Sequence, residues 1–451
     1  MKNFTPKELP LYKQKYTSAY KQFDKYIVFV ERAMDLLKDN GLLGYIVPLK
    51  FMKVGAGQEL RRLILTQKTL EAITAFGACK VFPGKSNYTC LLIVKKTEHE
   101  TFRYNEVSNL NQWKLADKNI LPIDTKSYDE ISESTWALFP EHLRGAYDTI
   151  LSNSTTLLAI TGEDNIFNGI QTSANKVYVF QPKSERNGIY TFEKDGQDWK
   201  VEKEVTRAYF QTSTGDDGLN TYRTFKPNAC VIFPYRKNDK DKLEMIPLDD
   251  IMHDYPKLYK YLLAHENILN AASRDIKPVP TTASEWHRYG RHQSLDACNL
   301  PKKIIVGVLS AGDKYAVDSF STFVSSGGTA GYCMIALPED SPYSIYYLQA
   351  ILNCKYLEWI SSLYGEIFGG GFIARGTKVL KQLPIRKIDF QNNDERLAHD
   401  SIGDLQKQLI QMGDEIDAAH GNKRKLTILQ RQFELSKQQL ADFIMHLYGM
   451  E

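Results

Sequence analysis

The sequence has little net charge and no long apolar run. Its 57 basic and 54 acidic residues leave a formal charge of +3 over 451 residues, so charge alone does not separate a nucleic-acid-binding protein from an ordinary enzyme. No window reaches the roughly 18 to 20 continuous apolar residues of a membrane span, and the N-terminal segment has no apolar stretch of the secretory type. We therefore expect a cytoplasmic protein without a membrane segment.

Cysteine and histidine are sparse as metal ligands. The six cysteines stand apart in the sequence, without a Cys-x-x-Cys pair and without a histidine at metal-ligand spacing, which argues against a zinc site. They are Cys79, Cys90, Cys230, Cys298, Cys333 and Cys354. We expect reduced thiols and no bound metal.

Apolar and aromatic residues, in contrast, are plentiful. With 43% hydrophobic and 25% charged residues, the chain can form two or three globular domains, each with its own core. The 12% aromatic content, with 26 tyrosines, fits aromatic cores and wet binding surfaces equally well.

The first hundred residues have the pattern of an α/β fold. Apolar residues at helical spacing, including Phe29, Met34 and Leu37, predict a helix that ends at Gly41, and LLGYIVP then runs apolar like a buried strand. LRRLILTQKTL predicts a second helix, EAITAFG a second strand, VFPGKSN a loop and YTCLLIVKK a third strand.

The remainder of the chain is typical of α+β and helical structure. Residues 101–160 have weak periodicity and are interpreted as a connector with short strands. Residues 161–390 hold many short strand-like runs and two helical stretches, around YPKLYKYLLAHENIL and SIYYLQAILNCKYLEWISSLY. The runs are KVYVF, GIYTF, ACVIFPY, KKIIVGVL and KYAVDS. Residues 391–451 carry two amphipathic patterns broken near HGNK, which predict a helical hairpin.

Several segments carry a family resemblance. The run FDKYIVFVERAMDLLKDNGLLGYIVPLKFM, followed by LRRLIL and VFPGKSNYTCLLIVKK, resembles the later part of the methyltransferase domain in TaqI-like N6-adenine DNA methyltransferases and type IIG restriction-modification enzymes. Later segments look like the target-recognition domain of that family. These are FNGIQTSANKVYVF, KKIIVGVLSAGDKYAVDS and the stretch at 348–389.

The resemblance implies a fold for each part of the chain. Residues 1–100 would be a truncated Rossmann-like subdomain of the fold that binds S-adenosylmethionine. Residues 161–390 would be an α+β target-recognition domain, with the helical segment 391–451 behind it. The family's Asn-Pro-Pro-Tyr motif is missing, since no Pro-Pro dipeptide occurs.

The missing motif bears on catalysis. Methyl transfer to adenine needs a site for the methyl donor and acceptors for the flipped base, and the resemblance places both upstream of Met1. The two glycine-rich pieces, at Gly55 and Gly370, do not follow a strand and open a helix as a cofactor turn requires. We read the first as a loop, whereas the second is either a flexible DNA-contact loop or a linker. We therefore expect no catalytic residue and no cofactor in this chain, although S-adenosylmethionine is implied for the complete enzyme.

One base-contacting residue is implied by the resemblance. Phe82, in VFPGKSN, falls where relatives stack an aromatic ring on the target adenine, a contact worth about 1 to 3 kcal/mol per base. The alternative is that Phe82 packs on the core beside Val81.

Truncation of the sheet predicts a partner. In the complete fold the strand LLGYIV pairs with the strand that precedes Asn-Pro-Pro-Tyr, so here its edge would be apolar and unpaired. Open edges recruit other strands. We expect a companion N-terminal methyltransferase polypeptide, with or without a nuclease, or else self-association or disorder of the first hundred residues.

The candidate DNA contacts lie in three loops of the central domain. Affinity would come from Lys and Arg on phosphates, and specificity from polar side chains at base edges. The expected contacts are Gln171, Thr172, Asn175, Lys176, Trp286, Arg288, Tyr289, Arg291, Gln293 and Arg375. The charged loop at Arg236 and Lys237 and the Lys-Arg-Lys run at 423–425 are better explained as solvated surface.

Three hypotheses follow. The chain is a DNA-binding specificity portion of an adenine methyltransferase, inactive alone. Alternatively, it is half of a split methyltransferase that a separate polypeptide activates, or a non-catalytic relic of a disrupted gene. Nuclease activity is not expected, because no Pro-Asp followed by Glu-x-Lys occurs. Neither the recognised base sequence nor DNA cleavage by a parent enzyme follows from the sequence.

Overall fold

The computed structural model describes residues 4–5, 7–85, 87–117, 123–212, 218–277, 285–327, 330–419 and 421–450. The chain divides into two units, each with its own internal contacts. The first unit comprises Met1–Ser152 and Glu358–Ala374, and the second comprises Asn153–Leu357 and Arg375–Glu451. The division falls within helix α12 (Lys355–Tyr364).

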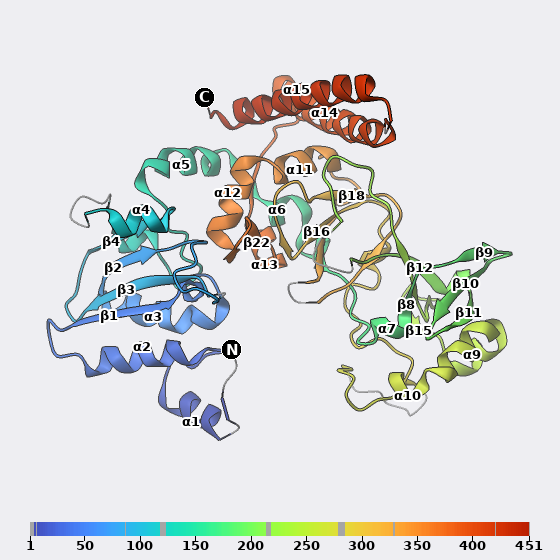
Figure 1. Cartoon of the computed structure of the whole chain (residues 1–451), viewed down its shortest axis with the longest axis horizontal. Helices are drawn as coiled ribbons and strands as arrows, with labels where there is room; N and C mark the ends of the chain where they lie inside the picture. The colour runs from blue at the N-terminus through green and yellow to red at the C-terminus, as the bar shows by residue number, and fades with distance from the viewer. Residues whose placement is uncertain are drawn as a thin grey trace. The chain divides into compact units, whose positions relative to one another are not determined.

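A five-stranded sheet forms the centre of the first unit, in the order β1-β3-β2-β4-β5 (Figure 1). Its strands are β1 (Leu42–Pro48), β2 (Leu70–Ala75), β3 (Thr89–Lys95), β4 (Thr101–Glu106) and β5 (Asp124–Ser127). Strand β3 is antiparallel to both of its neighbours, and β4 is parallel to β2. The strands β1, β2 and β4 therefore end at the same edge of the sheet.

The elements predicted for residues 23–96 are present in the predicted order. The segment 101–160, expected to be a connector with short strands, supplies β4 and β5 to this sheet. The reason is visible in β4, where Phe102 and Tyr104 alternate with exposed residues and are buried in the core. Periodicity over six residues is too short a signal to separate such a strand from a linker.

Helices pack on the sheet and close the core of the first unit. They are α1 (Glu8–Lys15), α2 (Lys25–Leu36), α3 (Gln58–Gln67), α4 (Leu110–Leu115) and α5 (Arg144–Ser152). Helix α2 buries Ile27, Val30 and Met34, whereas Phe29, expected on the same face, is 56% exposed. The core residues of α2 and α3 join those of the strands in one cluster.

Strand β1 lies at the edge of the sheet and is apolar. Among the described residues it pairs only with β3. Leu42, Tyr45 and Ile46 are exposed on it, with Ile46 at 52%. The structure thus contains the open apolar edge that the sequence predicts.

The second unit is built from several small sheets. The largest have the orders β19-β12-β13-β8 and β18-β16-β20-β7, and a three-stranded sheet has the order β11-β10-β9. The strands of these sheets are β7 (Ile166–Asn168), β8 (Val179–Phe180), β9 (Ser184–Arg186), β10 (Ile189–Lys194), β11 (Gln197–Glu202), β12 (Thr206–Phe210), β13 (Ala229–Ile232), β16 (Lys303–Gly307), β18 (Ala316–Asp318), β19 (Phe323–Val324) and β20 (Tyr332–Ile335).

Short strands and helices complete this mixed α/β arrangement. The short strands are β6 (Ser154–Thr156), β14 (Tyr235–Lys237), β15 (Leu243–Met245) and β23 (Pro384–Arg386). The helices are α6 (Leu157–Thr161), α7 (Asn175–Tyr178), α8 (Leu248–Asp254), α9 (Pro256–Ala264), α10 (Glu266–Leu269), α11 (Ile345–Leu352) and α13 (Thr377–Lys381). KVYVF, predicted to be a strand, begins instead in the helical turn α7, and only its last two residues form β8.

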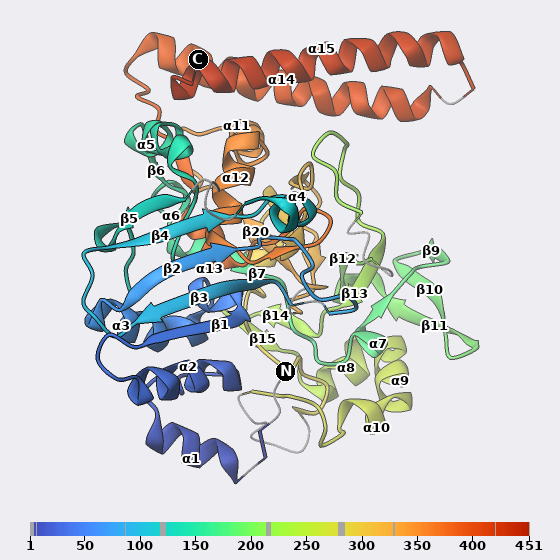
Figure 2. The same ribbon diagram turned by 60° about the vertical axis from the view of Figure 1, so that its left-hand side comes forward.

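Two long helices follow, α14 (Asn393–Ala418) and α15 (Lys423–Tyr448), and they lie side by side (Figure 2). Asn392 and Asn422 accept backbone N–H bonds at the two helix N-termini. Leu405, Leu409, Leu440 and Ile444 are buried, as their helical spacing predicts.

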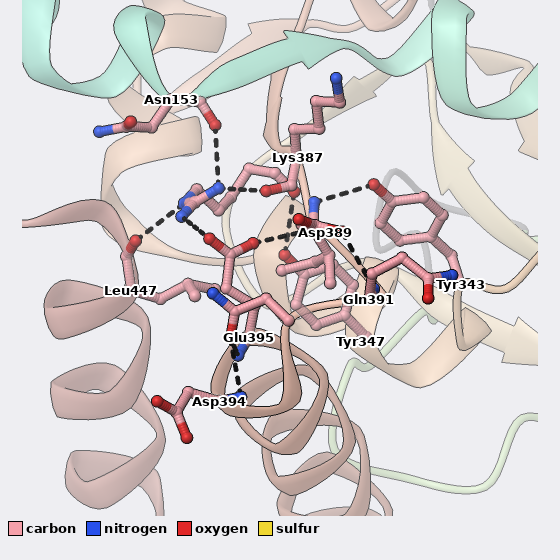
Figure 3. Close-up of polar contacts among 12 residues, drawn as sticks. Asn153, Tyr343, Tyr347, Lys387, Asp389, Gln391, Asp394, Glu395 and Leu447 are labelled. Atoms are coloured by element: carbon pink, nitrogen blue, oxygen red, sulfur yellow. Dashed lines mark hydrogen bonds and ion pairs between the residues drawn. The ribbon is translucent and has the colours of Figure 1, made fainter.

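Arg386 of β23 bonds to both long helices, through Glu395 and Leu447, which are labelled in Figure 3. Its Nη2 donates to Glu395 Oε1 of α14 at 3.1 Å, and its Nε donates to the Leu447 carbonyl of α15 at 3.0 Å. Glu395 Oε2 also accepts from the Asp389 N–H at 2.7 Å. Charge-assisted bonds to two elements fix the position of each helix end.

None of the helices in the described ranges combines the length and apolar character that a membrane crossing needs. Within those same ranges, no three His, Cys, Asp or Glu side chains are grouped so that they could hold a metal ion.

Candidate functional site

A cavity of about 480 Å³ lies in the first unit, at the edge where β1, β2 and β4 end. Residues just after each of these strands line it, among them Lys53, Gly77 and Ser108. Trp136 and Trp359 contribute apolar walls. The carboxyl ends of parallel strands are where open α/β sheets bind ligands.

Lys53 is the central cation of this cavity. Its ammonium donates to the carbonyl of Ser362, in the last turn of α12, at 2.5 Å and to that of Gly365, just after the helix, at 2.9 Å. A cation at a helix C-terminus is favourable, because the last carbonyls lack helical partners. Burial lowers the pKa of Lys53 to about 8.

Glu106 is the carboxylate of the same cavity. Tyr104, whose ring is buried, donates from its hydroxyl to Glu106 Oε2 and to the Leu138 carbonyl, each at 3.3 Å. Desolvation raises the pKa of Glu106, and the Tyr104 hydrogen bond and Lys53 oppose that rise. The cavity lining thus places the Lys53 ammonium and two carboxyl groups, those of Glu106 and Asp124, among aromatic walls.

We expect the stability of the first unit to depend on pH through Lys53. The folded pKa of about 8 is below the ordinary value of 10.5, so between these values the unfolded chain binds more protons and stability rises with pH. The free energy of unfolding of the native chain, minus that of Lys53→Met, should increase by up to about 3 kcal/mol from pH 7 to pH 10. Urea titrations of both proteins at several pH values measure this difference. A difference independent of pH would show that the Lys53 ammonium is not desolvated.

Phe82 lies in the loop between β2 and β3, and its side chain is 43% exposed. It therefore does not pack into the core beside Val81. Further along the same connection, Tyr88 accepts a hydrogen bond from the Gly369 N–H and packs edge-on against Phe368. The glycine-rich segment at 369–371 is the tip of a hairpin between β21 (Ile367–Phe368) and β22 (Phe372–Ala374), held against this connection.

The glycine-rich segments do not fit a methyl-donor turn. Gly55–Gly57 is a 3-10 turn that leads into α3, but no strand precedes it directly, so it does not connect a strand to a helix as a cofactor turn does. A Cβ at Gly57 would lie 2.1 Å from the Phe51 carbonyl oxygen, so this glycine is required for backbone packing. The Gly369–371 tip joins two strands. Neither segment supplies the strand, glycine turn and helix that S-adenosylmethionine requires.

In the second unit, two loops with predicted DNA contacts are joined through one arginine. We call residues 169–176 and 285–293 the recognition loops. Arg274 Nη2 donates to the carbonyls of Thr172 at 2.9 Å and Arg288 at 2.7 Å, and its Nη1 donates to Leu269 at 2.6 Å and Trp286 at 2.8 Å. Four carbonyl acceptors occupy the whole outer edge of the guanidinium.

The recognition loops also touch through their backbones. Gly290 donates its N–H to the Thr172 carbonyl at 3.0 Å, and Arg291 donates its N–H to the Gln171 carbonyl at 3.1 Å. A Cβ at Gly290 would lie 1.9 Å from Ser173 Oγ, so only glycine fits. Two loops more than a hundred residues apart in sequence therefore form one rigid surface.

Five of the predicted contact residues are exposed or partly exposed on the recognition loops. Asn175, Lys176 and Gln293 are exposed, and Gln171 and Arg291 are partly so. Arg291 forms an ion pair with Asp275, and the Gln293 amide donates to Ser326 Oγ at 3.0 Å. Asn175 Oδ1 accepts from the Thr172 hydroxyl at 2.5 Å, which makes Asn175 a turn former as well.

The other five predicted contacts are buried, so the expectation that they face DNA is corrected. They are Thr172, Trp286, Arg288, Tyr289 and Arg375. Tyr289 donates to the Ile232 carbonyl, and Arg288 bonds Glu285 and His292. Arg375 is 0% exposed, with its Nε donating to Ser310 Oγ at 3.1 Å. A loop composition of Trp, Tyr and Arg fits interior packing as well as it fits a DNA surface.

The two charged segments assigned to solvated surface are exposed. Arg236 pairs with Asp250 at 2.6 Å, and Lys237 pairs with Asp241 at 2.8 Å. Residues 423–425 form the exposed first turn of α15.

Sequence reasoning missed Lys53, Glu106 and Arg274. Lys53 follows β1, and Glu106 is the last residue of β4. Ligand-facing side chains gather at such strand ends, so these positions could have indicated both residues. Arg274 left no such signal, because its role depends on carbonyls from three distant segments.

Comparison with known proteins places this arrangement in a family. Residues 1–82 match the model of the Eco57I restriction-modification methylase family. The whole chain is 43% identical over 451 residues to the type II restriction enzyme and methyltransferase RM.Eco57I of Escherichia coli, of which it covers 45%.

More distant relatives are methyltransferases. Over 295 residues the chain is 23% identical to M.BstVI of Geobacillus stearothermophilus, covering 61% of this chain and 47% of that protein. Over 403 residues it is 22% identical to M.HindII of Haemophilus influenzae, covering 86% of this chain and 72% of that protein. The chain therefore spans about half the length of the first two relatives.

The fold also has a solved counterpart. The structure of the type IIL restriction-modification enzyme MmeI in complex with DNA is similar to this chain, with a TM-score of 0.57 and 10% sequence identity. The match covers 99% of this chain and 52% of the MmeI chain. That similarity concerns the fold alone. The family match at residues 1–82 and the 43% identity to RM.Eco57I show that the chain carries an Eco57I-like restriction-modification methylase domain and is a homologue of that type II enzyme.

Proposed function

We propose that this chain is the DNA-binding specificity portion of a site-specific N6-adenine DNA methyltransferase in a type II or IIG restriction-modification system, inactive in methyl transfer by itself. The observation that carries the proposal is the 43% identity to RM.Eco57I along the entire chain, which covers less than half of that enzyme. Double-stranded DNA is the proposed ligand, and S-adenosylmethionine the methyl donor of the complete enzyme.

The recognition loops are the proposed DNA-reading surface. Lys176 and Arg291 supply cations for phosphates, and Asn175, Gln171 and Gln293 supply amide groups for base edges. The Arg274 bonds and the close packing at Gly290 hold these side chains on one rigid support. Rigid presentation reduces the entropy lost on binding. In the first unit, exposed Phe82 is the proposed stacking partner of a flipped adenine.

The alternative function, one half of a split methyltransferase, is supported by the edge of β1. Leu42 and Ile46 are exposed beside an unpaired strand edge, which is the arrangement that recruits an added strand. A polypeptide with the methyl-donor site and the Asn-Pro-Pro-Tyr motif would pair there. A nuclease would belong to that polypeptide rather than to this chain.

DNA binding by the full chain tests the proposal. We expect a 30-base-pair duplex pool of random sequence to bind with an affinity that falls steeply from 50 to 200 mM salt. Lys176→Ala should weaken binding to every sequence and reduce the salt slope by about one, because one phosphate contact is lost. Lys425→Ala, an exposed lysine on α15, is the matched control and should leave both quantities unchanged. Fluorescence anisotropy measures both.

Methyl transfer separates the hypotheses. With radiolabelled S-adenosylmethionine, the chain alone should not label DNA, and addition of an N-terminal half from a relative should restore labelling if the split-enzyme alternative holds. Absence of duplex binding at 50 mM salt would refute the specificity role and leave the relic hypothesis. Labelling by the chain alone would refute its catalytic inactivity.

A further inference from the structure

We propose that a groove beside Phe320, separate from the recognition loops, binds a single-stranded segment of DNA, with an unpaired base stacked on Phe320 and its phosphates on Lys203 and Arg207. The proposal rests on the proposed function for the identity of the ligand, but the surface and the contacts are new.

Phe320 is displayed on an unusually well-fixed turn. The Phe320 side chain is 49% exposed, whereas Asp318, at the start of the same turn, is fully buried. Asp318 Oδ1 accepts from the Phe320 N–H at 2.9 Å, and both oxygens of Asp318 accept from the Thr322 N–H and hydroxyl at 2.8 Å. Ser321 has φ +52°, a conformation that non-glycine residues adopt only when the surroundings fix it.

The Asp318 carboxylate that holds the turn is one half of an ion pair in the core. Lys303 Nζ lies 2.8 Å from Asp318 Oδ2, with both side chains 0% exposed, and it also donates to the Cys298 and Leu300 carbonyls. The ion pair anchors the turn between β18 and β19, and this turn holds the Phe320 ring at the surface.

The groove next to Phe320 has the chemistry of a nucleic-acid strand site. Its volume is about 780 Å³. Lys203 and Arg207 line it together with Tyr190 and exposed Gln181. The Arg207 guanidinium also donates to the Glu204 and Thr206 carbonyls and lies over the Phe233 ring, so Lys203 is the more accessible cation. Among the thirteen described residues that line it, none is acidic. Lys203 pairs at 3.3 Å with Glu185, outside the lining, and a phosphate would replace that exposed partner.

Aromatic and basic side chains along one groove are the combination that binds unpaired strands. Base stacking on an exposed ring tolerates any sequence, and the backbone follows the cations. A paired duplex keeps its bases stacked on each other and offers no free face to Phe320. A purely electrostatic acidic partner would not need the ring. The groove therefore fits a single strand better than a duplex or an acidic peptide.

Binding of fluorescein-labelled (dT)15 by the full chain tests the inference. We expect Phe320→Ala to weaken (dT)15 binding by about 10- to 100-fold while duplex binding stays the same. Phe320→Trp should preserve (dT)15 binding, and Phe320→Leu, apolar but not aromatic, should not. Phe443→Ala, which removes a phenylalanine on α15 that is 41% exposed, is the matched control.

Each outcome has a distinct meaning. Native affinity of Phe320→Ala for (dT)15, absence of (dT)15 binding by the native chain, or displacement of (dT)15 by poly-L-glutamate at equal charge concentration would overturn the inference. If (dT)15 binds through Phe320 and no duplex binds, the inference stands and the proposed specificity function fails. If duplex binds and Phe320→Ala leaves (dT)15 binding unchanged, the proposed specificity function stands and the inference about Phe320 fails.

Discussion

Asp318→Ala is expected to lower the free energy of unfolding of the second unit by about 3 to 5 kcal/mol. The substitution leaves the Lys303 ammonium in the core without its carboxylate and removes the acceptor of the Phe320 and Thr322 N–H groups. Removing one member of a buried pair costs far more than a surface pair contributes, because the remaining charge is desolvated. Urea denaturation followed by circular dichroism, with limited proteolysis to identify the unit that opens, measures the loss.

A double variant is the control for this prediction. Lys303→Met with Asp318→Leu removes both charges and should recover much of the stability, since apolar side chains of similar size often replace a buried pair without loss. The carbonyls that Lys303 bonds would still lose their donor, so complete recovery is not expected. A loss below about 1 kcal/mol for Asp318→Ala would mean that the turn rearranges and that Phe320 is not held as described.

Arg274→Ala is expected to abolish specific DNA binding and to destabilise the second unit by on the order of 3 kcal/mol. Four carbonyls from Thr172, Leu269, Trp286 and Arg288 lose a charged donor at once. The recognition loops would then separate, although no proposed DNA contact is removed. Duplex affinity and hydrogen exchange at 171–176 and 286–291 are the measurements, and both loops should exchange faster.

Lysine cannot replace this arginine. Arg274→Lys keeps the charge, but three donors on one atom cannot reach four carbonyls around a planar fork. Its DNA affinity should therefore stay close to that of Arg274→Ala. Arg186→Ala, an exposed arginine on β9, should change neither stability nor exchange. Normal exchange in Arg274→Ala with lost DNA binding would instead indicate that Arg274 contacts DNA directly.

The elements of the first unit could be predicted because each is long and strongly patterned. The helix, strand, helix, strand, loop and strand of residues 23–96 follow from apolar periodicity and from glycine and proline at their ends. The apolar character of β1 was also predictable from its residues. The place of β3 between β1 and β2 was not, since sequence order gives no sheet order.

The short elements behaved differently. Six residues sufficed for β4 to join the sheet, because Phe102 and Tyr104 fill its core, and α7 replaced a strand that the run KVYVF predicts. In both segments tertiary packing outweighed local propensity, as expected where an element is too short to specify itself.

The sequence by itself determined the order of the long elements, the apolar edge strand and the family to which the chain belongs. Only the tertiary structure decided which side chains of the recognition loops reach solvent: Lys176 and Gln293 do, whereas Trp286 and Tyr289 fill the interior. It also brought together Lys53 with Glu106 and Lys303 with Asp318. The physical reason is that periodicity records burial along one element, whereas the exposure of a loop residue and the partner of a charge depend on distant segments that only folding brings within contact.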